Sequence, residues 1–457
     1  MLVVSLTACR NDRIDLQAEE GEAYAGGGTT VQNESRNAFS FAAANLTGRA
    51  SLEFTTGNSF FNQSWVAAVA STTGRDGLGP LFNETSCASC HFKDGRGRTP
   101  NFGEIQGHGM LLRLSLFGQA ADGSSLIEPT YGGQFNPVGI QGVAGEGDIA
   151  ITYQDVEGKY DDGTSYWLRH PTYTLQNLNY GSIDPNVIIS PRVANQMVGL
   201  GLLEAIEVAA IEQWIDEQDL SGNGISGKAN YVYDIAQGKK TLGRFGWKAG
   251  QPTVRQQVAA AFVGDIGITS SLFPNENHTS NQPDALAMPS GNNSDGYELD
   301  DLVLDRVTLY SSNLAVPIRR DWDDADVLQG KALFFDIGCQ DCHRQKYTTG
   351  THPDFSNLSN QTIYPYTDLL VHDMGEGLAD QSTEYSAGAG EWRTPPLWGI
   401  GLIENVNGHT ELLHDGRARN VAEAILWHGG EAATSQEKFK SLDNEERQQI
   451  IKFIQSL

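Results

Sequence analysis

Four cysteines and two histidines are spaced for one specific covalent chemistry. Each of two C-x-x-C pairs is followed directly by a histidine, and the members are Cys87, Cys90, His91, Cys339, Cys342 and His343. Two thiols at this spacing on one turn can form thioethers with both vinyl groups of a haem, and the adjacent histidine can then coordinate its iron. The motifs therefore predict two covalently attached c-type haems.

Two other uses of such cysteine pairs fit the sequence less well. A zinc ribbon also contains two C-x-x-C pairs, but its pairs lie close together, whereas Cys90 and Cys339 are far apart in this chain. A thioredoxin-like redox pair does not need a histidine directly after both motifs. Two c-type haems would use all four thiols of the two pairs, and Cys9 is the one other cysteine of the chain. No pair of thiols is therefore left for a disulfide.

The net charge and the lengths of the apolar runs limit the kinds of partner that the protein can bind. The chain has 457 residues, with 57 acidic and 31 basic side chains and a formal net charge of −26. This charge argues against a nucleic-acid partner, because an acidic surface repels phosphates. It suits the docking of a small basic redox protein as electron donor or acceptor. No apolar run reaches the roughly 18 residues needed to span a bilayer, which excludes an integral membrane protein.

The first nine residues resemble the end of a bacterial lipoprotein signal. The sequence Leu-Thr-Ala-Cys that ends at Cys9 is similar to a lipobox, and a polar, glycine-rich stretch follows it. We therefore predict a periplasmic or cell-surface lipoprotein, held to the membrane by a lipid on Cys9. The alternative is an ordinary N-terminal thiol. Attachment of c-type haem outside the bacterial cytoplasm agrees with export.

The chain is expected to form a flexible tether (1–35), a large first haem domain (36–320) and a compact second one (321–457). Residues 326–335 have the pattern of a helix that runs into the second haem motif, and 443–457 that of an amphipathic helix. Together such helices make the minimal cytochrome c fold. We therefore predict a mainly α fold with two cytochrome c-like domains, the first enlarged by long loops and insertions.

Other parts of the chain have weaker signals. Further helices are expected at 198–216, 254–264 and 419–428, and a long surface loop at 275–296. Strand signals are weak and short. A faint internal repeat follows each haem motif, with a turn around Arg192 or Arg417 and then a helix that carries Glu204 or His428, which suggests duplication with these last two residues at equivalent positions.

Five segments of the chain resemble the di-haem oxidoreductase family, relatives of bacterial di-haem cytochrome c peroxidase and of the di-haem enzyme that matures methylamine dehydrogenase. They are Cys87–Arg98, Gly199–Ile206, Arg244–Lys248, Arg393–Gly399 and Leu413–Glu431. The HDGRA and LWHGGEA sequences of the last segment are the most diagnostic. The resemblance covers most of residues 75–457. It implies an extracytoplasmic oxidoreductase with peroxidase-like chemistry, in which hydrogen peroxide or another small oxidant is the substrate.

The resemblance implies a division of work between the haems. The N-terminal haem is the peroxide site, and the C-terminal haem is six-coordinate and takes in or stores electrons. In the relatives, the helix after the second turn supplies the distal iron ligand, and His428 occupies the matching position here. We therefore expect His343 and His428 to ligate the second iron together. Met374 is an alternative ligand, and His428 would otherwise be a polar residue beside the haem propionates.

The relatives also place a carboxylate over the first iron. Peroxide cleavage needs a group that takes a proton from the near oxygen and returns it to the leaving one. Glu204, in an otherwise apolar segment, is the matching candidate, and Arg192 is expected either to assist charge separation or to bind a propionate. The alternative for Glu204 is a partner between helices or at a helix N-terminus.

Two further features of the relatives have uncertain counterparts here. His108 lies on a predicted loop after His91, where the peroxidases have a removable distal histidine, so it is a candidate iron ligand, with Met110 a second one; an ordinary loop histidine is the alternative. The relatives have a tryptophan between the haems, but no tryptophan occupies that position in this chain. Trp247 or Trp427 is the candidate substitute.

One loop resembles a calcium-binding sequence. Asp219, Ser221, Asn223 and Ile225 have the spacing of the first ligands of an EF-hand loop, with Gly224 at its sixth position. Asn230 replaces the final glutamate, which weakens the charge. The sequence leaves a Ca²⁺ site and a plain Gly/Asn turn as two open interpretations.

Three functions compete. The first is an enzyme that reduces peroxide or uses it to oxidise a substrate. The second is an electron-transfer cytochrome without peroxide chemistry, and the third is an electron-transfer partner in metal uptake or substrate oxidation. An electron carrier needs only about 100 residues per haem, so the size of the first domain favours the enzyme.

Overall fold

The computed structural model describes residues 18–72, 74–100 and 109–457. Its α-helices are α1 (Arg49–Asn62), α2 (Cys87–Cys90), α3 (Leu200–Glu204), α4 (Val208–Glu212), α5 (Val254–Ala261), α6 (Pro283–Leu286), α7 (Asp301–Ser312), α8 (Ala325–Asp336), α9 (Ile403–Asn407), α10 (Val421–Leu426), α11 (Ala433–Ser441) and α12 (Asn444–Ser456). No helix of the described residues is both long and apolar enough to span a membrane.

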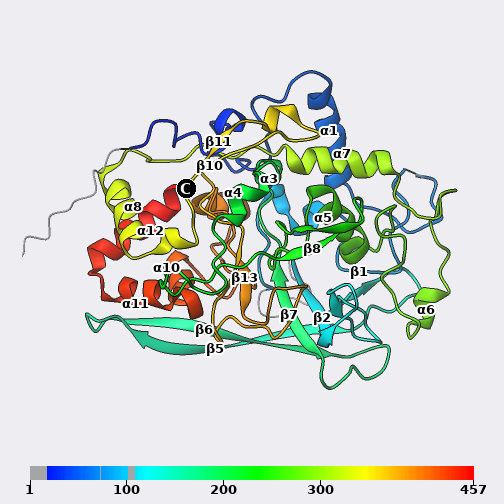
Figure 1. Cartoon of the computed structure of the whole chain (residues 1–457). Helices are drawn as coiled ribbons and strands as arrows, with labels where there is room; N and C mark the ends of the chain where they lie inside the picture. Colours follow the sequence, from blue (N-terminus) through cyan, green and yellow to red (C-terminus); the bar gives the residue numbers. More distant parts are fainter. Residues whose placement is uncertain (1–17, 73, 101–108) are drawn as a thin grey trace, which may run out of the picture.

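The strands form small antiparallel sheets, most of which lie in the middle and along the bottom of Figure 1. They are β1 (Leu81–Phe82), β2 (Met110–Gln119), β3 (Ser125–Leu126), β4 (Val138–Gly139), β5 (Asp148–Lys159), β6 (Ser165–Gln176), β7 (Ile188–Val193), β8 (Tyr231–Asp234), β9 (Lys239–Leu242), β10 (Tyr347–Thr348), β11 (Thr362–Ile363), β12 (Val371–Asp373) and β13 (Glu391–Arg393). The prediction of a mainly α fold was therefore wrong in its proportions, because strands are a substantial part of the chain.

The largest departure from that prediction is the long hairpin of β5 and β6. Its strands pair from Asp148 opposite Gln176 to Lys159 opposite Ser165. In Figure 1 the hairpin runs along the bottom, from the region of β2 and β7 to a position below α10 and α11. Arg169 of β6 donates to the carbonyl of Arg417 at 2.8 Å. The hairpin therefore belongs to the first half by sequence and contacts the second half in space.

The helices expected on either side of the second haem motif are confirmed. α8 runs into Cys339, and α12 begins at the predicted N-cap Asp443, where Asp443 and Glu446 form a reciprocal capping box. α12 packs across α8 where Gly330 is so close to the carbonyl of Gln449 that an added Cβ would lie 1.9 Å from it. This contact requires a residue without a side chain and fixes the crossing of the two helices.

Two of the other expected helices form nearly as predicted and one is broken. Residues 254–264 form α5 and the start of a π-helix, η3 (Phe262–Ile266), and 419–428 form α10. The predicted helix at 198–216 splits into α3 and α4 because Ile206 pairs as a β-bridge with Thr349 and Glu207 is extended. The predicted loop at 275–296 contains only α6.

The main apolar core does not stop at the predicted domain boundary near residue 320. It is a single cluster whose members come from both halves, among them Phe262, Val307, Phe334, Phe439 and Phe453. The division into two haem domains remains a prediction, and the two halves share one interior.

The described part of the predicted tether is packed rather than flexible. Glu22 is fully buried and pairs with Arg319 and with Lys331, the latter at 2.8 Å. It also accepts a hydrogen bond of 2.6 Å from the hydroxyl of Tyr366. The chain from residue 18 onward is therefore fixed to the second half by a buried ionic network.

Replacement of Glu22 by glutamine should destabilise the haem-loaded protein. Burial alone raises the pKa of Glu22, but Arg319 and Lys331 outweigh it and the pKa lies below its ordinary value. Such a group stabilises the fold above the unfolded-state pKa, and the contribution is lost as pH falls through the folded-state pKa. We expect Glu22→Gln to lower the free energy of unfolding by about 3 kcal/mol at pH 7, because the buried Arg319 and the half-buried Lys331 both lose their partner.

The measurement is denaturant unfolding at pH 7 and in acid, below the ordinary carboxyl pKa, with Glu20→Gln at an exposed neighbour as the control. The difference between wild type and Glu22→Gln should shrink in acid, because the wild-type carboxylate is then protonated as well. Equal stability of the Glu22→Gln and Glu20→Gln variants at pH 7 would show that the network contributes nothing.

Candidate haem site

Both C-x-x-C-H motifs open onto one cavity. Its volume is about 780 Å³, and its lining includes all four paired cysteines and both adjacent histidines. None of the four cysteines is in a disulfide, and burial raises the pKa of Cys87 and of Cys339 to about 12. A c-type haem would be held here by thioethers to these cysteines, and their place in the cavity lining fits that chemistry.

The two motif histidines are oriented as iron ligands. Nδ1 of His91 lies 2.7 Å from the carbonyl of Asn195, and Nδ1 of His343 lies 3.0 Å from that of Tyr366. A carbonyl can only accept, so Nδ1 must carry the proton and Nε2 has the free lone pair. Burial lowers the pKa of His91, and it lowers that of His343 to about 4, which keeps both rings neutral. Both residues therefore fit haem iron.

His428 shares the cavity with His343. Nδ1 of His428 is 2.6 Å from the carbonyl of Ala424, one turn earlier on α10, so its Nε2 is also available for iron. Burial lowers the pKa of His428, and a charge on His428 contributes to the lowered pKa of His343. Met374, the alternative ligand, also lines the cavity. The arrangement supports the His343/His428 prediction, which a ligand substitution must decide.

The carboxylate of Glu204 lies at a helix N-terminus, in agreement with the alternative interpretation of this residue. Its Oε1 accepts a hydrogen bond of 2.9 Å from the backbone N–H of Val254 at the start of α5, and its Oε2 is 3.2 Å from Nε2 of His352. Leu200 and Leu203 of the same helix line the cavity, whereas Glu204 does not. Its carboxylate thus holds the start of α5, and its predicted place over the first iron has no support in this geometry.

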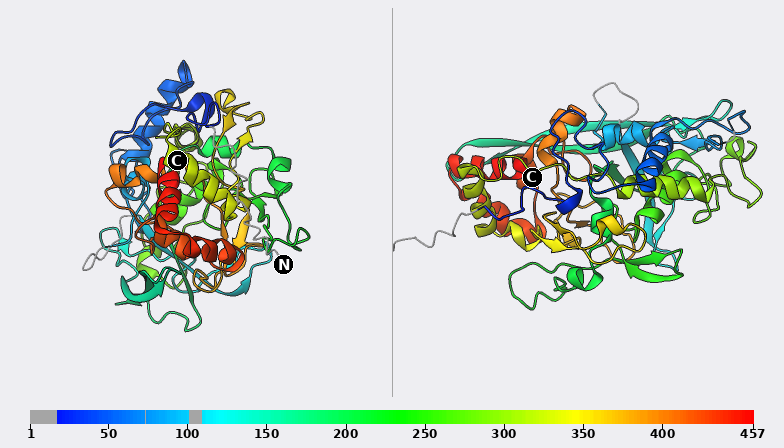
Figure 2. Two further views of the ribbon diagram at one scale, coloured as in Figure 1. Left: turned by 90° about the vertical axis from the view of Figure 1, so that its left-hand side faces the viewer. Right: turned by 90° about the horizontal axis from the view of Figure 1, so that it is seen from above.

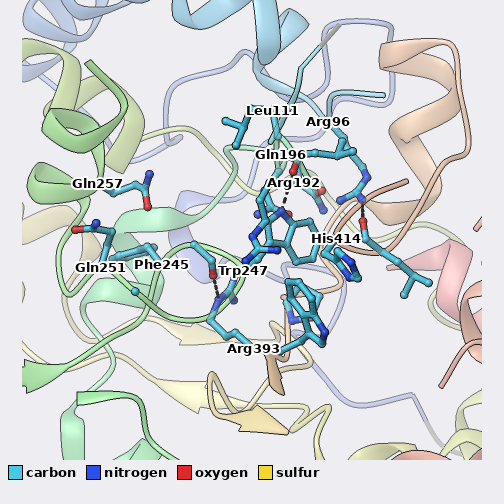
Figure 3. Close-up of a pocket in the computed structure, with 18 of the residues that line it drawn as sticks. Arg96, Leu111, Arg192, Gln196, Phe245, Trp247, Gln251, Gln257, Arg393 and His414 are labelled. Carbon is cyan, nitrogen blue, oxygen red and sulfur yellow. Dashed lines mark hydrogen bonds between the residues drawn. The ribbon is translucent and has the colours of Figure 1, made fainter. Parts of the chain in front are cut away.

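Other polar side chains occupy the wall of the cavity near the first motif. They are Gln251 and Gln257, from the segment that enters α5 and from α5 itself, and the carboxylates Glu84 and Asp265. Figure 3 shows Gln251, Gln257 and Phe245 on one side of the site, with Arg96 and His414 on the other. Sequence analysis missed these residues. Gln251, Gln257 and Asp265 lie far from either C-x-x-C-H motif in the chain, and Glu84, shortly before Cys87, has no local sequence signature.

Asp265 is the carboxylate in closest electrostatic communication with the first motif. It lies in the π-helix η3, a form of helix often associated with functional sites. Its Oδ1 accepts a hydrogen bond of 2.8 Å from Nε2 of Gln134. Burial raises its pKa, and its charge raises the pKa of both Cys87 and Cys90.

Arg192 lines the cavity, but its guanidinium is already paired. It lies 2.7 Å from Asp380 and 3.0 Å from Glu384, and it sits over the ring of Trp392 at 4.5 Å. Lys248 lies over the same ring at 4.3 Å. The predicted part of Arg192 in charge separation stays a prediction, while its observed part is to fix Trp392.

Aromatic rings form a cluster at the centre of the cavity wall. His414 and Trp392 are stacked with centroids 3.7 Å apart and planes 8° apart, and Trp247 meets His414 at 6.5 Å and 75°. All three line the cavity, and the indole N–H of Trp247 donates to the carbonyl of Val193 at 2.8 Å. Trp427, the other candidate from the sequence, packs against His170 and is not part of the lining.

In the predicted calcium loop, side-chain oxygens accept hydrogen bonds from the backbone of the loop and do not converge on a common point. The carboxylate of Asp219 accepts hydrogen bonds from the N–H of Gly224, and Oδ1 of Asn223 accepts from Ile225. Ser221 is exposed at the surface. In the described part of the chain, no three His, Cys, Asp or Glu residues gather as a metal site. The structure therefore gives the Ca²⁺ prediction no support, and the plain turn agrees with the observed bonds.

Two predicted residues lie outside the described ranges. His108, the candidate removable ligand, and Cys9, the candidate lipid attachment, cannot be placed relative to the cavity. Met110, the second candidate near His108, is buried at the start of β2 and lines the cavity.

The internal repeat has a different register from the expected one. Gly199 and Gly399 both have left-handed backbone and each begins a short helix, with the sequences Gly-Leu-Gly-Leu-Leu-Glu and Gly-Ile-Gly-Leu-Ile-Glu. By this register Glu204 corresponds to Glu404. The segment before His428 has neither the Gly-Leu-Gly-Leu-Leu-Glu sequence nor the left-handed glycine that precedes Glu204.

Comparison with known proteins yields one family. Residues 20–132 and 139–457 match the family model described as "Di-haem oxidoreductase, putative peroxidase". No curated protein matches the chain. A solved structure of hydrazine synthase from Kuenenia stuttgartiensis matches with a TM-score of 0.29 and 12% sequence identity, over 88% of this chain and 92% of that one. A similarity at this level carries no argument about fold or function.

Proposed function

Since the chain belongs to the di-haem oxidoreductase family, we propose that it reduces peroxide at the first haem site with electrons that enter at the second. The observation that carries the proposal is the single cavity in which both C-x-x-C-H motifs meet. An electron-transfer cytochrome does not require its two haems to share an interior. The c-type motifs and the lipobox-like sequence at Cys9 support a place outside the cytoplasm.

The two haems, when bound, supply iron for peroxide binding and for electron storage. The chain's own residues hold and separate these sites. His91 would hold the first haem iron, and His343 with His428 would hold the second, because each ring has Nδ1 bonded to a carbonyl and Nε2 available. With two histidines on the second iron, peroxide would bind at the first.

Proton transfer at the first site needs a group that can exchange a proton inside the cavity. An amide does not ionise, so Gln251 and Gln257 can orient a bound oxygen but cannot take up its proton. We propose Asp265 for this function, because it lines the cavity, is held by Gln134 and has an ionisable carboxyl group whose pKa is raised by burial.

We propose the ring cluster as the electron path between the sites. Trp247, His414 and Trp392 follow one another along the wall of the cavity, and the stacked pair has nearly parallel planes. Arg192 and Lys248 fix the outer ring of the cluster. An electron path through these rings does not require Trp427.

Spectroscopy of the haem-loaded protein tests the function. Optical and EPR spectra are recorded in the oxidised, half-reduced and reduced states, before and after addition of peroxide. We expect one haem that remains low-spin in every state and one that reacts with peroxide. The lag between the spectral changes of the two haems measures electron transfer through the cavity wall. Two haems that stay low-spin and ignore peroxide would reject the proposal and favour an electron carrier.

A further inference from the structure

The segment between α3 and β8 presents an exposed surface that the haem cavity does not explain. Three apolar side chains are unusually exposed there: Val208 at 38%, Trp214 at 37% and Leu220 at 84%. Both views in Figure 2 show this green segment projecting from the body of the molecule. We call these three residues, with the carboxylates between them, the α4 surface.

The chain segment that forms the α4 surface is strongly acidic. Between residues 204 and 227 the chain has no lysine or arginine, and its carboxylates are Glu204, Glu207, Glu212, Asp216, Glu217 and Asp219. Glu207 and Glu217 are exposed. Apolar side chains within a rim of one charge sign are typical of a docking site for a partner of the opposite sign.

The surface is connected directly to the second haem motif. The guanidinium of Arg344, the residue after His343, lies 4.0 Å above the ring of Trp214. On the far side of the loop, Ser226 donates from its N–H and its hydroxyl to Glu431 at 2.9 and 2.6 Å. Ile225 of the same loop lines the haem cavity. A partner bound at Trp214 would thus contact the side chain that packs against Arg344, and Arg344 directly follows His343, the predicted ligand of the second iron.

The loop that carries Leu220 is held in shape. The N–H of Asp216 donates to the carbonyl of Ser226 at 3.0 Å and closes the base of the loop. The carboxylate of Asp216 accepts from the N–H groups of Leu220 and Ser221 at 2.7 and 3.0 Å. Leu220 is therefore presented to solvent by a preorganised turn, which lowers the entropy that a partner must overcome on binding.

We infer that the α4 surface docks a basic redox protein that delivers electrons to the second haem site. This inference rests on the proposed function and adds the partner and its place of contact. In each encounter one electron leaves the partner, which is oxidised, and the second iron is reduced from ferric to ferrous. A second copy of this chain is a poor occupant, because two acidic surfaces repel each other.

Charge reversal tests the docking site on the haem-loaded protein. The variant is Glu207→Lys/Glu217→Lys, and the matched control is Asp284→Lys/Asp295→Lys at exposed positions on and after α6. The probe is a reduced, strongly basic mono-haem cytochrome c, mixed by stopped flow at low and high salt. We expect the second-order rate of the variant to fall roughly tenfold at low salt and to lose most of its salt dependence, with little change in the control.

A small reductant separates this inference from the function on which it depends. Ascorbate should reduce all variants at the wild-type rate, because it needs no docking surface. Leu220→Ser should raise the concentration of cytochrome c at half-maximal rate several-fold while the ascorbate rate stays constant. Equal rates with cytochrome c for wild type, variant and control would overturn the docking site even if peroxide is turned over. A protein that docks cytochrome c but ignores peroxide would instead overturn the proposed function.

Discussion

Replacement of His428 by alanine should change one haem, and only one, from low-spin to high-spin. The ring lines the same cavity as His343, with Nδ1 bonded to the carbonyl of Ala424. Removal of an imidazole ligand leaves the iron five-coordinate or bound to water, a weaker ligand. Covalent attachment through Cys339 and Cys342 is untouched, so haem content should remain two per chain.

EPR and optical spectra of the oxidised variant provide the measurement. His170→Ala is the matched control, because this ring packs on Trp427 without lining the cavity. Met374→Leu is the competing variant. If Met374→Leu produces the high-spin haem while His428→Ala remains low-spin, the ligand is methionine, and the bis-histidine assignment fails.

Replacement of Asp265 by asparagine should slow the reaction with peroxide by about 100-fold, a loss of about 2.7 kcal/mol in transition-state stabilisation. Asparagine keeps the oxygen that accepts the hydrogen bond from Gln134, so the fold around η3 should persist. What is lost is the ionisable oxygen. Haem content and the spectrum of the second haem should stay unchanged.

Single-turnover stopped-flow kinetics with peroxide measure this effect, with two comparison variants. Glu204→Gln should react at nearly the wild-type rate, because Glu204 binds the start of α5 outside the cavity lining. Glu84→Gln removes another of the carboxylates that line the cavity. A large loss in Glu84→Gln or Glu204→Gln, with Asp265→Asn unaffected, would transfer the proton-transfer function to that residue.

Covalent chemistry was readable from the sequence because it depends on local spacing. The C-x-x-C-H motifs specify the attachment sites within five residues, and Asp443 with Glu446 specifies the start of α12 within one turn. His428 was found through the family resemblance, and the structure brings it to the cavity. Each of these signals lies within a single short segment.

The peroxide side of the site could not be read in this way because it is assembled from distant segments. The direction in which Glu204 points depends on the break in the helix after Ala205, and that break follows from a bridge between Ile206 and Thr349 far along the chain. Likewise, Trp392 became part of the site only through its stacking on His414. Neither contact has a local sequence signature.

The long hairpin was missed although its signal was present. β5 and β6 are joined by residues 160–164, with Asp161-Asp162-Gly163 as a recognisable turn sequence. β5 does not alternate in burial and is exposed over most of its second half, whereas β6 alternates between half-buried and exposed residues without any fully buried one. The period-2 pattern is strong only where one face of a strand is buried against a core.

The position of that hairpin has a consequence for how the protein reaches its native state. Arg169 and Arg417 are 248 residues apart in the chain, and the ion pair between Arg447 and Asp162 spans an even longer separation. Contacts of such high sequence separation form late and slow the folding of a domain. The hairpin of β5 and β6 packs against the second half although it is synthesised long before it. A fragment that begins near residue 321 would therefore lack the hairpin that contacts Arg417 and Arg447. We therefore expect the two halves to fold as one cooperative unit.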